Sequence, residues 1–183
     1  MGFDSRHTAR TPLLLVDVDG VISLFGFDHQ APPDGHYQLV DGIAHFLSAA
    51  AGGHLRRLAE RFELAWCTGW EEKANDYLPA ALGLAGELPF LSFGEVDRTV
   101  PAHWKLIAVE EFAGADRAVA WIDDAHDHRC HAWARARRAP TKLVGTDPAS
   151  GITAEHVVEL RSWAAELASG RSLRSRGHGE HGR

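Results

Sequence analysis

The chain has 183 residues, of which 45% are hydrophobic and 24% are charged, and its formal net charge is −6. This composition is that of a soluble globular protein with one core, and the acidic balance excludes the overall basic character of a nucleic-acid-binding protein. No apolar run approaches the roughly 20 residues of a membrane span, and the opening residues lack the apolar core of a signal peptide. Two cysteines, Cys67 and Cys130, make no disulfide framework, so we expect a reduced, cytoplasmic compartment.

The first expected element is a buried strand over residues 12–18, with the sequence PLLLVDV. Two aspartates, Asp17 and Asp19, interrupt the apolar run where the strand ends, and Gly20 follows directly. A buried carboxylate is unfavourable unless another group pairs with it, and two adjacent carboxylates also repel each other. The pair therefore predicts a functional site.

The rest of the chain alternates between strand-like and helix-like segments. Residues 20–37 are rich in glycine and proline and favour a small hairpin, whereas residues 36–48 fit either a strand or a helix. Further strands are expected at residues 63–68, 88–93, 117–124 and 140–147. Helices are expected at residues 54–62, 70–83, 101–114 (opened by Pro101), 128–138 and 153–170, the last with Thr153 as N-cap. We expect one domain over residues 1–169 and a disordered polar tail over 170–183.

Alternating strands and helices predict an α/β domain with a mostly parallel central sheet. In such sheets, ligands bind beyond the carboxyl ends of the strands. Five polar residues follow three of the expected strands at that point: Asp17, Asp19, Thr68, Asp123 and Asp124. We therefore expect them to meet at one edge of the sheet.

These motifs resemble those of the haloacid dehalogenase (HAD) superfamily of phosphotransferases. VDVDGV, WCTGW, the region of Lys105 and WIDDAHD occur in the superfamily's order over residues 12–147. More narrowly, ELAWCTGWEEKAN, WIDD and PTKLVGTDPASGIT resemble the HAD domains of bacterial RNA-repair proteins. The resemblance implies a Rossmann-like three-layer sandwich. The stretches between the motifs are too short for a separate cap domain, which implies an open site.

The chemistry of a phosphatase gives the first two aspartates unequal roles. A carboxylate nucleophile can accept a phosphoryl group as an aspartyl-phosphate, and Asp17 is placed for this as the first acid after the strand. Asp19 lies two residues on and points the same way in an extended chain, so it can protonate the leaving oxygen and then activate water. Dehalogenases of the superfamily lack this second acid, so its presence favours a phosphatase.

A carboxylate that approaches a phosphate dianion requires a cation, which implies Mg²⁺. Asp17 and Asp123 are the expected side-chain ligands, and the resemblance implies that the main-chain carbonyl of Asp19 is a third. Asp124 is expected to share the metal site or to orient a lysine. Asp127 could do the same or could cap the following helix.

The remaining candidates bind the phosphoryl group or the substrate. Thr68 supplies a hydroxyl, Gly69 lets the backbone approach a phosphate, and Trp70 can line the entrance and stack on a ring. Lys105 is expected to stabilise the charge of the transferring group, at the position that the superfamily uses. Lys73 is its main rival, because it lies close behind Thr68.

Several alternatives stay open at this point. The substrate is a phosphomonoester, either a small molecule or a nucleic-acid end, and the basic residues between 129 and 142 either bind nucleic acid or form a solvated helix face. His126, His128, Cys130 and His131 fit no common zinc site, and a helix start with solvated histidines is expected instead. The alternative functions are phosphotransfer to an acceptor other than water and a non-catalytic HAD-like binding module. Oligomeric state is not determined by the sequence.

Overall fold

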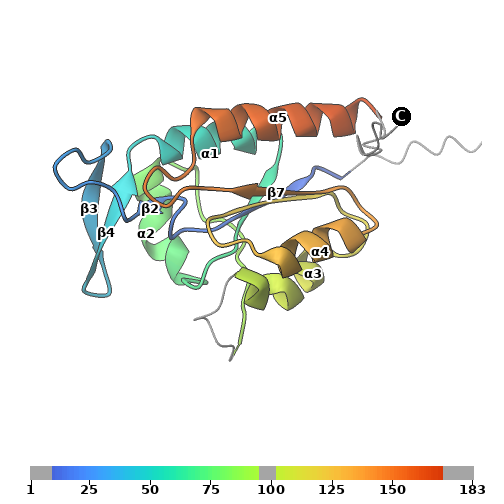
Figure 1. Ribbon diagram of the computed structural model, residues 1–183, viewed down its shortest axis with the longest axis horizontal. Coiled ribbons are helices and arrows are strands. Elements are labelled where there is room, and N and C mark those ends of the chain that lie inside the picture. The colour runs from blue at the N-terminus through green and yellow to red at the C-terminus, as the bar shows by residue number, and fades with distance from the viewer. Residues whose placement is uncertain (1–9, 95–101, 171–183) are drawn as a thin grey trace, which may run out of the picture.

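The computed structural model describes residues 10–94 and 102–170, and its centre is a four-stranded parallel sheet (Figure 1). The strand order is β5-β1-β6-β7. The strands are β1 Leu13–Val16, β5 Glu63–Trp66, β6 Val119–Asp123 and β7 Thr141–Gly145. Every residue of β1 and β6 is buried, as expected for strands that are covered on both faces. The predicted parallel α/β sheet is confirmed.

Helices cover both faces of this sheet, so the fold has three layers (Figure 1). One face carries α1 Ala51–Ala59, α2 Lys73–Leu82 and α5 Ala154–Ala168. The other face carries α3 Leu106–Ala113, which follows a short 3₁₀ turn η1 (Ala102–Lys105), and α4 His128–Ala136. Side chains of β1 alternate between the two layers: Leu14 and Val16 pack toward α1, α2 and α5, and Leu13 and Leu15 pack toward α3 and α4.

A second, smaller sheet lies beside the first, in the order β2-β4-β3 (Figure 1, left). Its strands are β2 Ser23–Leu24, β3 Gly35–Val40 and β4 Ile43–Ser48. The β3–β4 hairpin turns at Asp41 and Gly42, which both have positive φ (50° and 83°), as the two-residue turns of hairpins require. A hairpin insertion is thus confirmed, but it lies further along the chain than residues 20–37, and residues 36–48 are strands rather than a helix.

The expected strand at residues 88–93 forms only a single bridge, between Phe90 and Trp66 of β5. Two hydrogen bonds make it, from the Trp66 N–H to the Pro89 carbonyl (2.8 Å) and from the Leu91 N–H to the Trp66 carbonyl (3.0 Å). Pro89 has no N–H to donate, and Gly94 turns the chain at a φ of 61°, so the pairing does not extend.

The structure also bears on the expected N-cap of the last helix and on the expected lack of a cap domain. The Thr153 N-cap is seen at the start of α5, where the Thr153 N–H donates to His156 Nδ1 (3.1 Å). No separate cap domain is present among the described residues, because β2–β4 and α1 fill the chain between β1 and β5. Pro101 and nearly all of the expected tail, 171–183, lie outside the described ranges. Within those ranges, no helix has the length and apolar character needed to cross a membrane.

Candidate active site

The carboxyl ends of three neighbouring strands bring the predicted acids together. Val16 of β1 pairs with Trp66 of β5 on one side and with Ile122 of β6 on the other. The residues that follow these partners therefore share one rim of the sheet. Asp17 and Asp123 lie there beside each other. Both are buried, with 7% of Asp17 and 0% of Asp123 exposed.

Lys105 lies between these two acids. Its Nζ is 2.9 Å from Asp17 Oδ2 and 2.7 Å from Asp123 Oδ2, and only 4% of the residue is exposed. The lysine reaches them from the end of η1, which the hydrogen bond from the Ala102 N–H to the Ala125 carbonyl (3.1 Å) fastens to the loop after β6. The remaining oxygens are also bound, because Asp17 Oδ1 accepts from the Val18 N–H (2.8 Å) and Asp123 Oδ1 accepts from the Ala125 N–H (2.9 Å).

Burial and the charges of the neighbouring groups together shift the pKa values of Asp17, Lys105 and Asp124. Burial raises the pKa of Asp17 to about 8, an effect that Lys105 opposes and Asp123 adds to. Burial alone would lower the pKa of Lys105, but Asp17 and Asp123 raise it above its ordinary value, so this side chain stays charged. The pKa of Asp124 is also raised, by burial and by the neighbouring charge of Asp123.

Asp17, Asp123 and Asp124 form what we call the carboxylate cluster. One oxygen from each lies within 4.8 Å of the others, and within the described residues no other group of acids, histidines or cysteines is arranged in this way. If all three carboxylates are ionised, one lysine leaves two negative charges unbalanced, and this surplus is what raises the pKa values of Asp17 and Asp124 further. Carboxylate oxygens with this surplus suit Mg²⁺, which takes a few carboxylates together with water and substrate oxygens. The residues present therefore fit the implied metal.

Gly20 explains how Asp124 reaches the cluster. A Cβ on Gly20 would lie 2.4 Å from Asp124 Cγ, and Gly20 has a φ of 72°, which disfavours any other residue. Thr146, in the loop after β7, holds this corner by donating its hydroxyl to the Gly20 carbonyl (2.8 Å). The glycine after the two aspartates is therefore needed both for the turn and for the position of Asp124.

The Asp19 side chain is not one of the three carboxylates of the cluster, and its contacts run to Trp70 before α2 and to the small sheet. The indole Nε1–H of Trp70 donates to Asp19 Oδ2 (2.9 Å), and Nδ1 of His45 is 3.5 Å from Asp19 Oδ1. His45 also contacts the Ser23 hydroxyl (3.0 Å) and packs edge-on against Trp70, with ring centres 4.6 Å apart. Asp19 is thus held at both oxygens and is not drawn into the lysine pair.

Residues 68–71 make a tight turn after β5. The Glu71 N–H donates to the Thr68 carbonyl (3.0 Å), the Trp70 N–H donates to Thr68 Oγ1 (3.4 Å), and Glu71 has a φ of 50°. Thr68 is 1% exposed, and Gly69 separates it from Trp70. The turn therefore places Thr68 at the sheet rim and directs Trp70 to Asp19.

Residues 13–157 match the family described as the HAD domain in Swiss Army Knife RNA repair proteins. The chain belongs to this family. The match spans both sheets and most of α5's first turn, so the HAD relationship expected from the motifs is confirmed.

Solved structures of HAD proteins are also similar, at a distance. An HAD superfamily (subfamily III A) hydrolase from Legionella pneumophila is 17% identical, with 87% of this chain and 88% of that chain covered and a TM-score of 0.41. The 3-deoxy-D-manno-octulosonate 8-phosphate phosphatase from Moraxella catarrhalis, in complex with magnesium ion, phosphate ion and KDO, is 18% identical over 86% of this chain and 92% of that chain, also with a TM-score of 0.41. No curated protein matches the sequence.

Lys73, the rival of Lys105, does not reach the carboxylate cluster of this HAD domain. Its ammonium forms an ion pair with Asp41 at the tip of the β3–β4 hairpin, and 58% of its side chain is exposed. The Tyr77 hydroxyl donates to the other oxygen of Asp41 (3.1 Å). We call this contact between the hairpin tip and α2 the Asp41 clasp. Lys105 is therefore the lysine that this structure brings to the acids.

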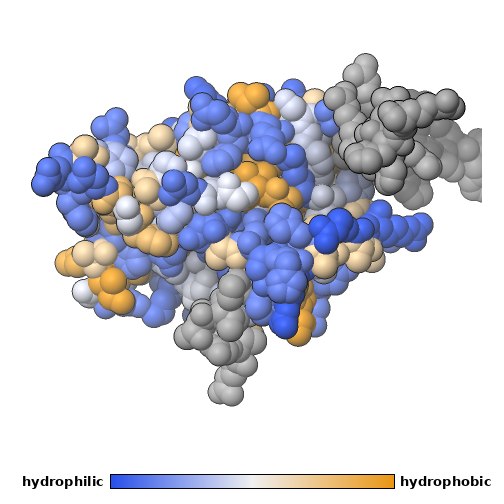
Figure 2. All heavy atoms as spheres, in the orientation of Figure 1, coloured by the Kyte–Doolittle hydropathy of each residue, from blue (hydrophilic) through white to orange (hydrophobic). Residues whose placement is uncertain are grey.

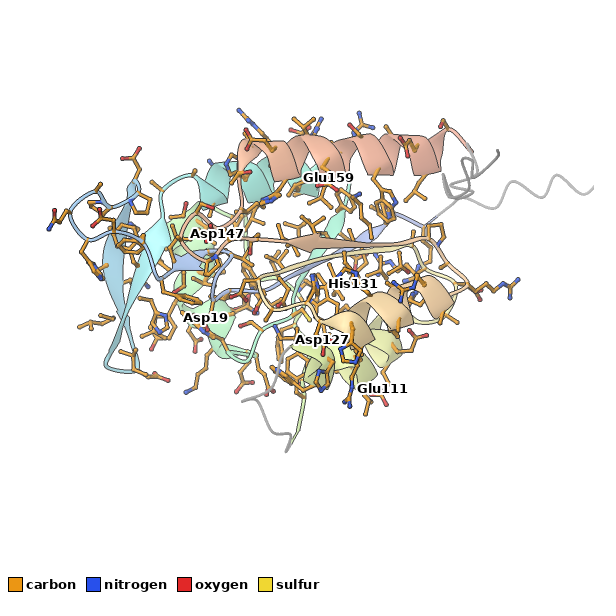
Figure 3. The ribbon with its side chains drawn as sticks, viewed as in Figure 1. Asp19, Glu111, Asp127, His131, Asp147 and Glu159 are labelled. Carbon is orange, nitrogen blue, oxygen red and sulfur yellow. The ribbon has the colours of Figure 1, made fainter. Side chains whose placement is uncertain are left out.

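Asp127 caps α4 and stands apart from the metal candidates. Its Oδ1 accepts from the N–H groups of Arg129 (3.0 Å) and Cys130 (3.1 Å), and its Oδ2 is 2.7 Å from His103 Nδ1. These hydrogen bonds hold its pKa below the ordinary value although burial would raise it. Figure 3 shows Asp127 and His131 beside α4, away from Asp19. Of the two alternatives for this residue, the helix cap is the one observed.

Three of the five basic residues between 129 and 142 form ion pairs with acids. The pairs are Arg137 with Glu110 (2.6 Å), Arg138 with Asp116 (3.6 Å) and Lys142 with Glu159 (2.8 Å). Arg137 is also bound to three further oxygens and is a structural residue. Arg129 and Arg135 of α4 are exposed, which favours the solvated helix face, and the ion pairs give no support to a nucleic-acid surface.

His45 is the site residue that the sequence did not reveal. Its role depends on the hairpin, which brings it next to an aspartate 26 positions earlier in the chain. The signal that could have found it is the Asp41–Gly42 pair, a typical two-residue hairpin turn. With the hairpin placed there, His45 falls on the strand that pairs with Ser23 and its neighbour Leu24.

Proposed function

We propose that this HAD domain is a Mg²⁺-dependent phosphatase that hydrolyses a phosphomonoester through an aspartyl-phosphate on Asp17. One observation carries the proposal: Lys105 bridges Asp17 and Asp123 at the ends of adjacent strands, with an oxygen of Asp124 within 4.8 Å of an oxygen of each. Asp19 stands beside them in a separate hydrogen-bonded position. A nucleophile, a charge stabiliser, a metal site and an acid are therefore all within one rim.

In the first half of the reaction, a carboxylate oxygen of Asp17 attacks phosphorus and the bond from phosphorus to the leaving oxygen breaks. Asp19 gives its proton to that oxygen, which departs as an alcohol. Lys105 and the Thr68 hydroxyl stabilise the charge on the phosphoryl oxygens. When bound at the carboxylate cluster, Mg²⁺ keeps Asp17 ionised and offsets the charge repulsion between it and the phosphate.

In the second half, Asp19 accepts a proton from a water molecule that attacks the phosphorus of the aspartyl-phosphate. The bond between phosphorus and the Asp17 oxygen breaks, inorganic phosphate leaves, and both aspartates return to their starting states. The indole N–H of Trp70 donates to Asp19 and fixes the direction of its side chain, so Trp70 acts by positioning the acid.

The test separates the two aspartates by their effect on a covalent intermediate. With an aryl phosphate, whose leaving oxygen needs little protonation, Asp19→Asn should still be phosphorylated at Asp17 but hydrolyse the intermediate slowly. Rapid mixing, acid quench and intact-mass measurement should then show one added phosphoryl group in Asp19→Asn and none in Asp17→Asn. The control is Asp116→Asn, an exposed acid far from the rim, which should turn over like the wild type.

Three results would contradict the proposal. A phosphoryl group on Asp17→Asn would show that another residue is the nucleophile. Near wild-type turnover of that variant would leave the acids as a metal site alone. Turnover that persists in excess chelator would remove the metal from the mechanism.

A further inference from the structure

A cavity of about 400 Å³ adjoins the rim on the side of the small sheet. This volume lies within the roughly 300–1,000 Å³ of small-molecule sites. Asp19 forms part of its wall, and most of the rest is aromatic: Phe25, Phe27, His29, Tyr37, His45 and Phe46. The proposed mechanism uses Asp19 and leaves the aromatic wall without a role.

The rings pack against each other and leave an open side. Phe46 is at the base, with its ring centre 4.8 Å from that of Phe27 and 5.0 Å from that of Tyr37, while Phe27 also contacts His29 at 5.2 Å. Phe46 is 7% exposed, whereas Phe25 and Tyr37 are 49% and 61% exposed. At this end of the molecule, hydrophobic residues are exposed among hydrophilic ones (Figure 2, left). Exposed aromatic rings beside the buried ring of Phe46 offer a surface on which a further ring can pack.

The local sequence makes room for this arrangement. A Cβ on Gly35 would lie 2.5 Å from Cε1 of Phe46 and 2.4 Å from the Leu47 carbonyl, so only glycine leaves Phe46 in its place. Gly26 lies between Phe25 and Phe27 with a φ of 74°, which turns the chain at the cavity wall. Both glycines occur where the aromatic wall requires them.

The position of Asp19 determines which part of a substrate the cavity receives. In the proposed function, Asp19 protonates the leaving oxygen, and the group attached to that oxygen must extend past Asp19. Asp19 lines the cavity, and no member of the carboxylate cluster does. The inference below therefore rests on the proposed function and specifies the leaving group.

We propose that the cavity binds a planar ring carried by the leaving group, so that the substrate is a phosphomonoester of a ring-bearing alcohol such as a nucleoside. Stacking between a base and an aromatic side chain contributes about 1–3 kcal/mol, which corresponds to roughly 5- to 150-fold in binding. Two of the polar side chains on the wall, Ser23 and His45, are hydrogen-bonded to each other, and Asp19 is hydrogen-bonded to Trp70, so most of the remaining contact area is aromatic. Recognition is therefore by ring faces, and pyrimidine and purine rings should be accepted alike.

The first test compares esters that differ only in the ring. Values of kcat/KM are measured for uridine and adenosine 5′-monophosphates and for ribose 5-phosphate, which has the same phosphorylated carbon but no base. Both nucleotides should exceed ribose 5-phosphate by at least about 10-fold, from the stacking of one base. In Tyr37→Ser and Phe25→Ser this ratio should fall by at least about 5-fold. Leu39→Ser is the matched control, because Leu39 is a 68% exposed residue of the same hairpin outside the cavity wall, and its ratio should stay unchanged.

The second test does not depend on turnover. Saturation-transfer NMR with uridine 5′-monophosphate and Asp17→Asn should show transfer to the base protons, and adding Tyr37→Ser should abolish it while adding Leu39→Ser should not. Equal kcat/KM for the nucleotides and ribose 5-phosphate would overturn the ring site while the phosphatase stands. Failure to hydrolyse any ester would overturn the phosphatase, and the NMR signal would then decide the ring site alone: its absence overturns it.

A third experiment distinguishes a mononucleotide substrate from a nucleic-acid end. A 5′-phosphorylated oligonucleotide is compared with the mononucleotide of the same base. Higher kcat/KM for the mononucleotide assigns the site to small molecules, and higher kcat/KM for the oligonucleotide assigns it to nucleic-acid ends; both support the ring site.

Discussion

Replacing Lys105 by methionine tests the electrostatic account of the site most directly. Methionine keeps the length and the apolar stem of the side chain but removes the charge that Asp17 and Asp123 share at 2.9 and 2.7 Å. Both acids are almost fully buried, so the change leaves two carboxylates side by side without a counter-charge. Removing one partner of a buried ion pair typically destabilises a protein by about 3–5 kcal/mol, and we expect a loss of that size.

The assay is urea unfolding in the presence of chelator, with Lys73→Met as the matched control. Lys73 also forms an ion pair with an aspartate, but it is 58% exposed, and exposed pairs contribute about 0–1 kcal/mol. The loss in Lys105→Met should be larger near about pH 8.5 than near about pH 5.5, because protonation of a carboxylate relieves the repulsion. Turnover of an aryl phosphate should fall by at least about 100-fold, the usual effect of deleting one charge stabiliser.

The free energy of unfolding of the wild-type protein without metal should also fall as the pH rises, but by less than that of Lys105→Met. The pKa of folded Asp17 is raised to about 8 from an ordinary 3.8, so the protonated carboxyl favours the folded state. Its contribution to the free energy of unfolding is complete below about pH 4 and is lost as the pH rises through about 8. The electrostatic account would be wrong if Lys105→Met were no less stable than Lys73→Met, or if its loss were the same at both pH values.

Three other predictions follow from neighbouring contacts. Trp70→Phe keeps the ring but removes the N–H that holds Asp19, so turnover should fall by about 10-fold for alkyl phosphates and less for aryl phosphates; an equal fall for both would contradict a role through the acid. Asp127→Ala removes the cap of α4 and should lower the free energy of unfolding by about 1 kcal/mol in urea, whereas an unchanged midpoint would show that the cap is dispensable. Added Mg²⁺ should raise the Tm by binding the carboxylate cluster, more at about pH 8 than at about pH 6 because protons compete for Asp17; a Tm that ignores Mg²⁺ would contradict the metal site.

The central sheet and its rim could be predicted because their signals are local. β1 and β6 are continuous apolar runs that end in acids, and parallel pairing brings such ends together whatever lies between them. The approach of Lys105 could not be read from spacing, since it depends on how η1 packs against the loop after β6; the resemblance to HAD proteins supplied that position.

The small sheet was harder to predict because one of its strands, β3, has a weak burial pattern. β3 exposes most of its residues, so no buried run marks it as a strand, and the positive φ of Asp41 and Gly42 is visible in the sequence only as an Asp-Gly pair. At residues 88–93 the sequence predicted a strand where the structure has only a single bridge. An apolar run suggested a full strand, but Pro89 lacks the donor that a strand there would need.

The Asp41 clasp has a consequence for how readily the aromatic wall can move. The hairpin carries Tyr37 and Phe46 and is joined at its tip to α2 by groups that are largely exposed, so salt screens the attraction over about 8 Å at physiological ionic strength. The chain can open and remake this contact at small free-energy cost, whereas it cannot separate Lys105 from Asp17 without leaving charges buried and unpaired. Ionic strength should therefore alter the rate at which bulky substrates enter and leave, and leave the alignment of the reacting groups unchanged.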